Sequence, residues 1–288
     1  MSNYVIYTDS ACDIKGDLLE NWGVKAINLT LSFESDGKEL ANNEIAARDF
    51  YERMRNGDVA KTSAVNMEAF KEAFELELKD GNDVLYIGFS SGLSTTYNSA
   101  RIAAEELAAD YPERKILTVD SLCASAGFGM LIRLATLKKE EGALIEEVAD
   151  FVNEKVPHMC HWFTVDDLVY LKRGGRISPT VAFVGGLLGI KPVLHMDDEG
   201  HLVSVSKVRG RISAIKALAD KFDELAIDNT TGPVYISHGD CIGDAEALAG
   251  MIESKHGVKT EIITDVGPVI GAHSGPGTLA LFFLGKVR

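Results

Sequence analysis

The stretch from Tyr86 to Tyr97 gathers hydroxyl side chains and glycines at one predicted turn. Apolar residues 84–87 predict a short buried strand, and the spacing of Tyr97, Ala100, Ala104 and Leu107 predicts a helix after the turn. The turn between them carries five hydroxyl groups, those of Ser90, Ser91, Ser94, Thr95 and Thr96. Because the first turn of a helix has free backbone N–H groups, such a segment can bind an anion.

The same stretch contains the pattern Gly88-x-Ser90-x-Gly92, which is typical of the nucleophile turn of serine hydrolases. A hydrolase of this kind also needs an acid and a histidine later in the chain, and Asp240 or Asp265 followed by His273 satisfies that order. The pattern is short, and no His-Gly-Gly-Gly segment supplies a second oxyanion donor. A serine hydrolase that uses Ser90 and His273 is therefore kept as the alternative function.

Composition and charge restrict the class of protein. The chain has 288 residues, of which 46% are hydrophobic and 25% charged, values typical of a soluble globular protein with a real core. A formal net charge of −14 argues against a broad nucleic-acid surface, which needs clustered Lys and Arg. Two basic clusters, 172–176 and 207–211, are either ligand or partner contacts or ordinary solvated loops.

The cysteines and the apolar runs indicate where the protein works. Four cysteines stand far apart with no C-x-x-C pair, so we expect reduced thiols in a cytoplasmic protein and no metal site. The longest apolar runs, 181–190 and 279–284, are too short to cross a bilayer. The start of the chain lacks the features of a signal peptide, so we expect a soluble protein without an anchor.

Strands and helices alternate in the first half of the chain. Strands are predicted at 4–7, 84–87 and 116–119, and helices from Met67 after the cap Asn66, from about Ser125, and over 145–152. This alternation predicts an α/β domain over 1–157 with a mostly parallel sheet flanked by helices. Ligands of such sheets bind at the carboxyl ends of the strands, where these hydroxyl groups gather.

Two other regions follow a different pattern. Residues 20–60 fit the alternation poorly: 24–33 resembles a half-exposed strand and 42–55 a helix, which predicts a small excursion. Residues 158–288 predict an α+β domain with a strand pair at 193–196 and 201–205, then helices and strands in turn through 264. The glycine-rich run 181–190 is either close-packed core or the wall of a tunnel for an apolar chain, and His273 lies between glycines where no regular helix is expected.

Taken together, seven segments resemble motifs of the DegV family of bacterial fatty-acid-binding proteins, and they occur in family order over nearly the whole chain. They are Thr8-Asp-Ser10, Thr62-Ser63, Ser90-Ser-Gly-Leu-Ser-Thr-Thr-Tyr97, Val119-Asp-Ser121, Tyr170-Leu-Lys-Arg-Gly-Gly-Arg-Ile-Ser178, Leu188-Gly-Ile-Lys-Pro192 and His273-Ser-Gly-Pro-Gly277.

The resemblance implies a DegV-like fold whose N-terminal and C-terminal domains enclose one long-chain fatty acid in a tunnel between them. It implies that Thr62 and Ser94 hold the carboxylate, that Arg176 and His273 support it, and that Ser63, Thr95 and Ser274 lie beside them. It further implies a non-catalytic carrier without a cofactor, which presents the fatty acid to an ATP-dependent fatty-acid kinase for acyl-phosphate formation in phospholipid metabolism. Arg209 and Arg211 would be candidates for kinase docking. A carrier or sensor of another small carboxylate or lipid remains a further alternative.

Overall fold

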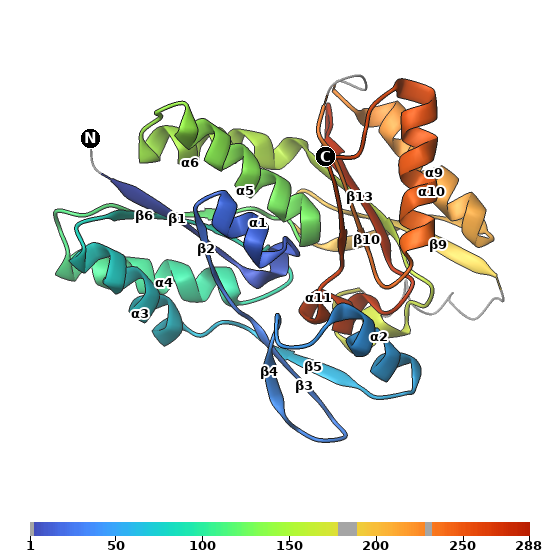
Figure 1. Cartoon of the computed structure of the whole chain (residues 1–288), viewed down its shortest axis with the longest axis horizontal. Helices are drawn as coiled ribbons and strands as arrows, with labels where there is room; N and C mark the ends of the chain where they lie inside the picture. The colour runs from blue at the N-terminus through green and yellow to red at the C-terminus, as the bar shows by residue number, and fades with distance from the viewer. Residues whose placement is uncertain (1–2, 178–188, 228–231) are drawn as a thin grey trace.

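A four-stranded parallel sheet is built from the first half of the chain (Figure 1). The computed structural model describes residues 3–177, 189–227 and 232–288. The sheet has the order β2 (Val24–Ile27), β1 (Tyr4–Asp9), β6 (Asp83–Gly88) and β7 (Ile116–Asp120). The two central strands are almost completely buried, as expected when helices cover both faces of a parallel sheet.

Two pairs of helices cover this sheet, one on each face (Figure 1). One pair is α3 (Met67–Lys79) with α4 (Thr96–Asp110), and the other is α5 (Ser125–Glu140) with α6 (Ile145–Lys155). The short helices η1 (Ser10–Cys12) and α1 (Gly16–Asn21) follow β1. Asn66 caps α3 by accepting the backbone N–H of Ala69, which confirms the predicted helix start. The predicted α/β architecture with a mainly parallel sheet is therefore confirmed.

The second half forms a six-stranded mixed sheet. Its strand order is β10 (Leu202–Arg209), β9 (Ile190–Met196), β8 (Met159–Thr164), β13 (Leu279–Leu284), β11 (Val234–His238) and β12 (Ile262–Asp265). The predicted strand pair is confirmed as β9 and β10, which are antiparallel. Helices α9 (Arg211–Leu225) and α10 (Ile242–His256) pack against this sheet. The other helices in the described part of the second half are η2 (Val156–His158), α7 (Val169–Arg173) and α11 (Pro268–Ser274).

A small antiparallel sheet accounts for the predicted excursion near residues 20–60. It consists of β4 (Glu39–Ala41), β3 (Thr30–Phe33) and β5 (Ala60–Ser63), accompanied by α2 (Ala47–Arg55). The expected single strand over 24–33 is wrong, because its first part is β2 of the parallel sheet and its second part is β3. The predicted helix starts later than Asn42: α2 begins at Ala47, and the side-chain amide of Asn42 instead contacts the backbone of Ser10 and Val269.

Helix α5 lies between the two large sheets. It contacts η1 on one side and β8, β11 and β13 on the other, and most of its first half is buried. Two glycines permit this close approach: a Cβ on Gly127 would lie 2.5 Å from Nε2 of His161, and one on Gly129 would lie 2.4 Å from Ile14. The start of α5 is therefore fixed relative to both halves of the molecule.

Two other sequence predictions are not tested by the structure. The predicted domain boundary at 157 and 158 stays a prediction. The run 181–190, interpreted as core or tunnel wall, lies almost entirely outside the described residues. Within the described ranges, no helix is long and apolar enough to cross a membrane, and no cluster of His, Cys, Asp and Glu could hold a metal ion.

Candidate ligand-binding site

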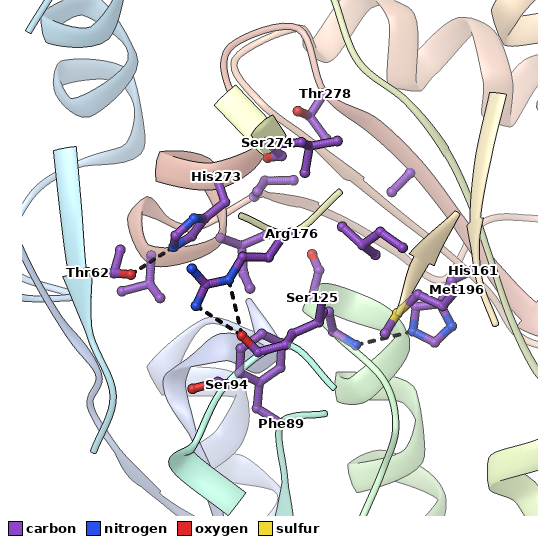
Figure 2. A pocket seen from close by; sticks show the side chains of 18 of the residues that line it. Thr62, Phe89, Ser94, Ser125, His161, Arg176, Met196, His273, Ser274 and Thr278 are labelled. Carbon is purple, nitrogen blue, oxygen red and sulfur yellow. Dashed lines mark hydrogen bonds between the residues drawn. The ribbon is translucent and has the colours of Figure 1, made fainter. Parts of the chain in front are cut away.

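A cavity of about 520 Å³ lies between the two halves of the molecule (Figure 2). All seven residues predicted to hold or support a carboxylate line it: Thr62, Ser63, Ser94, Thr95, Arg176, His273 and Ser274. Of these, Ser63 and Thr95 are exposed and mark the opening. The buried part of the wall is largely apolar and includes Phe89, Phe163, Met196, Ala280 and Phe282. The cavity thus has a polar, accessible end and a mainly apolar interior.

The turn after β6 is braced by a carboxylate at the end of β1. Asp9 accepts hydrogen bonds from the phenol of Tyr86 at 2.7 Å and from the backbone N–H of Phe89 at 3.0 Å. Burial raises the pKa of Asp9 to about 6, while these hydrogen bonds act in the opposite direction. Asp9 of the Thr8-Asp9-Ser10 motif therefore positions the turn through hydrogen bonds, and it does not itself line the cavity.

A second brace comes from the end of β7. Asp120 accepts the backbone N–H of Ser91 at 3.2 Å, and Ser121 donates its hydroxyl to the carbonyl of Gly88 at 2.6 Å. The strand-end motifs of β1 and β7 thus fix the intervening turn of β6 from both sides. This explains why these polar residues follow neighbouring parallel strands.

Ser94 lies where this turn enters α4. Its Oγ accepts the backbone N–H of Thr96 at 3.2 Å and lies 2.9 Å from the hydroxyl of Thr96. Thr95 has φ −76° and ψ −4°, an unstrained right-handed conformation. Either hydroxyl can be the donor in the pair with Thr96, and when Thr96 donates to Ser94, the O–H of Ser94 can be donated to an anion in the cavity.

Thr62 and His273 come from opposite halves of the molecule and meet at the cavity (Figure 2). Thr62 Oγ1 in β5 lies 2.8 Å from Nε2 of His273 in α11. Nδ1 of His273 is buried against Gly174, where an added Cβ would lie 2.1 Å away, and it has no hydrogen-bond partner among the described residues. We assign the proton to Nε2, since a proton on Nδ1 would be buried without an acceptor. His273 then donates to Thr62, and the Thr62 hydroxyl is free to donate into the cavity.

The expectation that no regular helix contains His273 is wrong. The seven-residue helix α11 starts at Pro268, where proline is favoured because no backbone donor is lost, and it ends at Gly275 with φ +82°. Burial, with a further contribution from the Arg176 charge, lowers the pKa of His273 to about 4. His273 is therefore a neutral hydrogen-bonding group near neutral pH.

Arg176 joins the loop after α7 to the turn before α4. Its Nε and one Nη donate to the carbonyl of Leu93, and the other Nη donates to the carbonyl of Gly174. Three of its five N–H groups are used in this way, which leaves two for a ligand. Ser274, the next residue after His273, is buried in the wall, and its hydroxyl has no partner in the described part of the chain.

The structure does not bring Ser90 and His273 together as a nucleophile and base. Ser90 is fully buried, donates its hydroxyl to the carbonyl of Gly200 at 2.9 Å, and is absent from the cavity wall. The two candidate acids are engaged elsewhere, Asp240 with Arg55 and Asp265 beside His238. The Gly-x-Ser-x-Gly pattern here is a structural turn.

The two arginines predicted to dock a kinase differ in accessibility. Arg209 is exposed on β10. Arg211 is largely buried and forms ion pairs with Asp244 at 2.8 Å and Asp166 at 3.7 Å. Of the pair, Arg209 is the one available to a partner.

Sequence reasoning missed four polar residues of the wall, namely Ser125, His161, Ser237 and Thr278. Of these, His161 is buried in β8 and lines the cavity (Figure 2). Burial lowers its pKa to about 3, so its imidazole is neutral. The available signals were the apolar strand around His161 and the small residues at the start of α5, which permit close packing.

The chain is similar to known proteins over nearly its whole length. The family model described as "Uncharacterised protein, DegV family" matches residues 3–286. A DegV domain-containing protein of Clostridium perfringens is 42% identical, over 100% of this chain and 99% of its own length.

Two solved structures share the fold. One, from Thermus thermophilus, is described as a fatty-acid-binding DegV family protein. It has a TM-score of 0.88 and 30% identity, and the match covers 98% of this chain and 99% of that one. The other is a stearic-acid-binding protein from Eubacterium ventriosum with a TM-score of 0.88 and 27% identity, covering 98% of each chain. The family match over almost the entire chain, together with this fold, shows that the protein belongs to the DegV family.

Proposed function

We propose that this protein binds one long-chain fatty acid, with the carboxylate at the polar opening and the acyl chain in the apolar interior. The observation that carries the proposal is the cavity of about 520 Å³ whose hydroxyl groups, His273 and Arg176 gather at the accessible end. This volume falls in the range of roughly 300–1,000 Å³ that is usual for small-molecule sites. The fatty-acid-binding descriptions of the two structural relatives support the same ligand class.

Burial of the acyl chain supplies most of the binding free energy. Each methylene removed from water contributes about 0.8 kcal/mol, so a chain of roughly 16 carbons contributes ~12 kcal/mol before ordering costs. The entropy lost when the flexible acyl chain is ordered offsets several kcal/mol of this contribution. The result is tight but reversible binding, which suits a carrier.

The carboxylate needs strong hydrogen bonds to offset its desolvation. Thr62 and Ser94 each have an O–H to donate, and Arg176 supplies a nearby positive charge with two N–H groups not used by the protein. A net charge of −14 gives no long-range attraction for an anion, so these groups must act at short range.

In this proposal the protein is a carrier, and a partner performs the chemistry. A carboxylate held beside the exposed Ser63 and Thr95 faces solvent, whereas the chain is hidden. An ATP-dependent fatty-acid kinase could therefore reach the carboxylate and form an acyl phosphate without removing the chain from the cavity. Arg209 on the surface is the residue that we expect to contact the kinase.

Mass spectrometry of an organic extract of the purified protein tests the ligand class. We expect one long-chain fatty acid per chain. Recovery of a different small carboxylate or lipid, at one per chain, would replace the fatty acid in the proposal.

Site variants test the orientation. Thr62→Val combined with Ser94→Ala should lower fatty-acid affinity by about tenfold or more, because the carboxylate loses two donors. Thr62→Ser, which keeps the hydroxyl, is the matched control and should bind nearly as well as the original chain. Equal affinity of all variants in a fluorescent fatty-acid displacement assay would show that the carboxylate lies elsewhere.

Kinase presentation has a separate test. The loaded protein, ATP and a bacterial fatty-acid kinase should yield acyl phosphate, trapped by hydroxylamine as a hydroxamate. Arg209→Glu should reduce the rate, whereas Lys15→Glu, the same charge change at an exposed position in the first half of the chain, should not. Product formed without kinase would contradict the carrier role.

A further inference from the structure

A second set of polar side chains in the cavity wall is joined by hydrogen bonds within itself. Ser125 at the start of α5 and Ser237 in β11 line the cavity with their Oγ atoms 2.9 Å apart. Ser125 also donates to Oδ2 of Asp13 at 2.6 Å. In the described residues, this trio has no hydrogen bond to Thr62, Ser94 or His273.

Two of these three residues belong to the cavity wall. Ser125 is 5% exposed and Ser237 0%, although both belong to the wall. Asp13 is 7% exposed and does not line the cavity. Asp13 therefore supports the two wall hydroxyls from outside the cavity, and Ser125, which is hydrogen-bonded to both other groups, is the central hydroxyl of the trio.

Two residues of this trio have a strained backbone conformation. Asp13 and Ser125 both have φ +53°, in the left-handed region that residues other than glycine rarely adopt. A glycine at 125 would avoid the strain but would remove the hydroxyl. Strained positions of this kind concentrate where a side chain has to be placed for function.

The charges around the trio favour a neutral ligand group that can both donate and accept a hydrogen bond. Burial raises the pKa of Asp13 to about 8, and Asp265 and Asp9 add to the effect. Its Oδ1 lies against Gly267 without a well-aligned hydrogen-bond donor among the described residues. With Asp13 charged, the serine protons point toward the carboxylate and leave lone pairs for the ligand. When Asp13 is protonated, it can donate to Ser125 instead, and a serine O–H is then available to the ligand.

An alcohol can hydrogen-bond to the serines whether Asp13 is charged or protonated, whereas a methylene can do so in neither state. We propose that Ser125, backed by Asp13 and Ser237, is a subsite for a hydroxyl group carried on the acyl chain, so that the protein takes monohydroxy fatty acids. The inference rests on the proposed function, since it places the carboxylate at the opening. The hydroxyl then lies along the chain, away from the carboxylate.

Competition binding tests this subsite. Octadecanoic acid and positional isomers of monohydroxy-octadecanoic acid would each displace a fluorescent fatty acid from the original chain and from Ser125→Gly, which removes the hydroxyl and relieves the left-handed strain. For at least one isomer, we expect the affinity relative to octadecanoic acid to fall about tenfold in the variant, because a buried hydroxyl loses its partner. Ser254→Gly, at an exposed serine near the end of α10 that does not line the cavity, is the control and should leave the ratio unchanged.

The outcomes separate this inference from the proposed function. Ser237→Ala, which keeps Ser125, should reduce the same ratio by a smaller factor. If octadecanoic acid binds but every isomer gives the same ratio in the original chain and in Ser125→Gly, the hydroxyl subsite is overturned while the fatty-acid site stands. If neither octadecanoic acid nor any isomer binds, both proposals fall.

Discussion

Two buried carboxyl groups near the cavity differ in how the protein supports them. Asp9 accepts from Tyr86 and two backbone N–H groups, and burial raises its pKa to about 6. Asp13 receives one short side-chain hydrogen bond, from Ser125, and its pKa is raised further, to about 8. Asp13 is therefore the group whose protonation changes between neutral and mildly alkaline solution.

We expect Asp13 to make the protein less stable as the pH rises from about 7 to about 8.5. Its pKa is about 8 in the folded state against 3.8 in the unfolded chain, so the folded state binds more protons and its stability falls as they are lost. Asp13→Asn removes this dependence. In urea unfolding, the variant should lose about 1 kcal/mol less than the original chain over that interval.

The interval avoids interference from the buried histidines. His161 and His273, with pKa values lowered to about 3 and 4, affect stability only below about pH 6.5. Asp198→Asn, at an exposed loop carboxylate, is the control. The same slope in the original chain and in Asp13→Asn would mean that Asp13 is already ionised in the folded protein.

Some site residues could be predicted from the sequence, whereas others could not. The residues at the opening occur in short motifs, so resemblance to a family identified Thr62, Ser94 and His273, and all of them line the cavity. Ser125 and Ser237 have no such motif. Only the packing of α5 on β11 brings them together, and single-chain spacing contains no information about that contact.

At the scale of secondary-structure elements, Arg176 connects the loop after α7 to the turn before α4. Arg176→Met should lower the free energy of unfolding by about 1–3 kcal/mol, because two carbonyl groups, those of Leu93 and Gly174, lose their donors. Fatty-acid affinity should also fall, by about tenfold or more, as the turn loosens and a positive charge is lost. Urea unfolding and fluorescent displacement measure the two effects.

The matched control lies at the end of α7, three residues before Arg176. Arg173→Met removes an exposed guanidinium that stacks over Tyr170, and it should change both quantities little. If the two variants weaken binding equally, the effect of Arg176 is one of general charge, and its hydrogen bonds to Leu93 play no special part.

Elements with strong local signals could be predicted, and those fixed by tertiary contacts could not. The apolar stripe of α3 and its Asn66 cap define that helix within the sequence itself. Helix α11 is too short for a periodic stripe and is flanked by glycines. Its start is held from outside, by the Asn42 amide accepting the backbone N–H of Val269 at 2.8 Å.

Across the whole molecule, α5 connects the two large sheets. Gly127→Ala should lower the free energy of unfolding by about 1–3 kcal/mol, since the new methyl group would press on His161 and Phe282 in the second sheet. Alanine normally stabilises a helix interior relative to glycine, so the sign of the effect is diagnostic.

Gly250 in α10 provides the control, because a Cβ there meets nothing within 4 Å. Gly250→Ala should leave stability unchanged or raise it by up to about 1 kcal/mol. Thermal and urea unfolding compare the two variants. Stabilisation by Gly127→Ala would show that α5 and the second sheet are not in close contact in solution.

The carboxylate end of the cavity is divided between the two halves of the chain: Thr62 and Ser94 precede η2, whereas Arg176 and His273 follow it. A ligand held there ties both halves into one cooperative unit. Linkage then requires that it delay unfolding of the entire molecule, by about 4 kcal/mol at a free concentration a thousand times its dissociation constant. Loaded and empty protein should therefore differ sharply in resistance to proteolysis, so that a cell could clear empty carriers while sparing full ones.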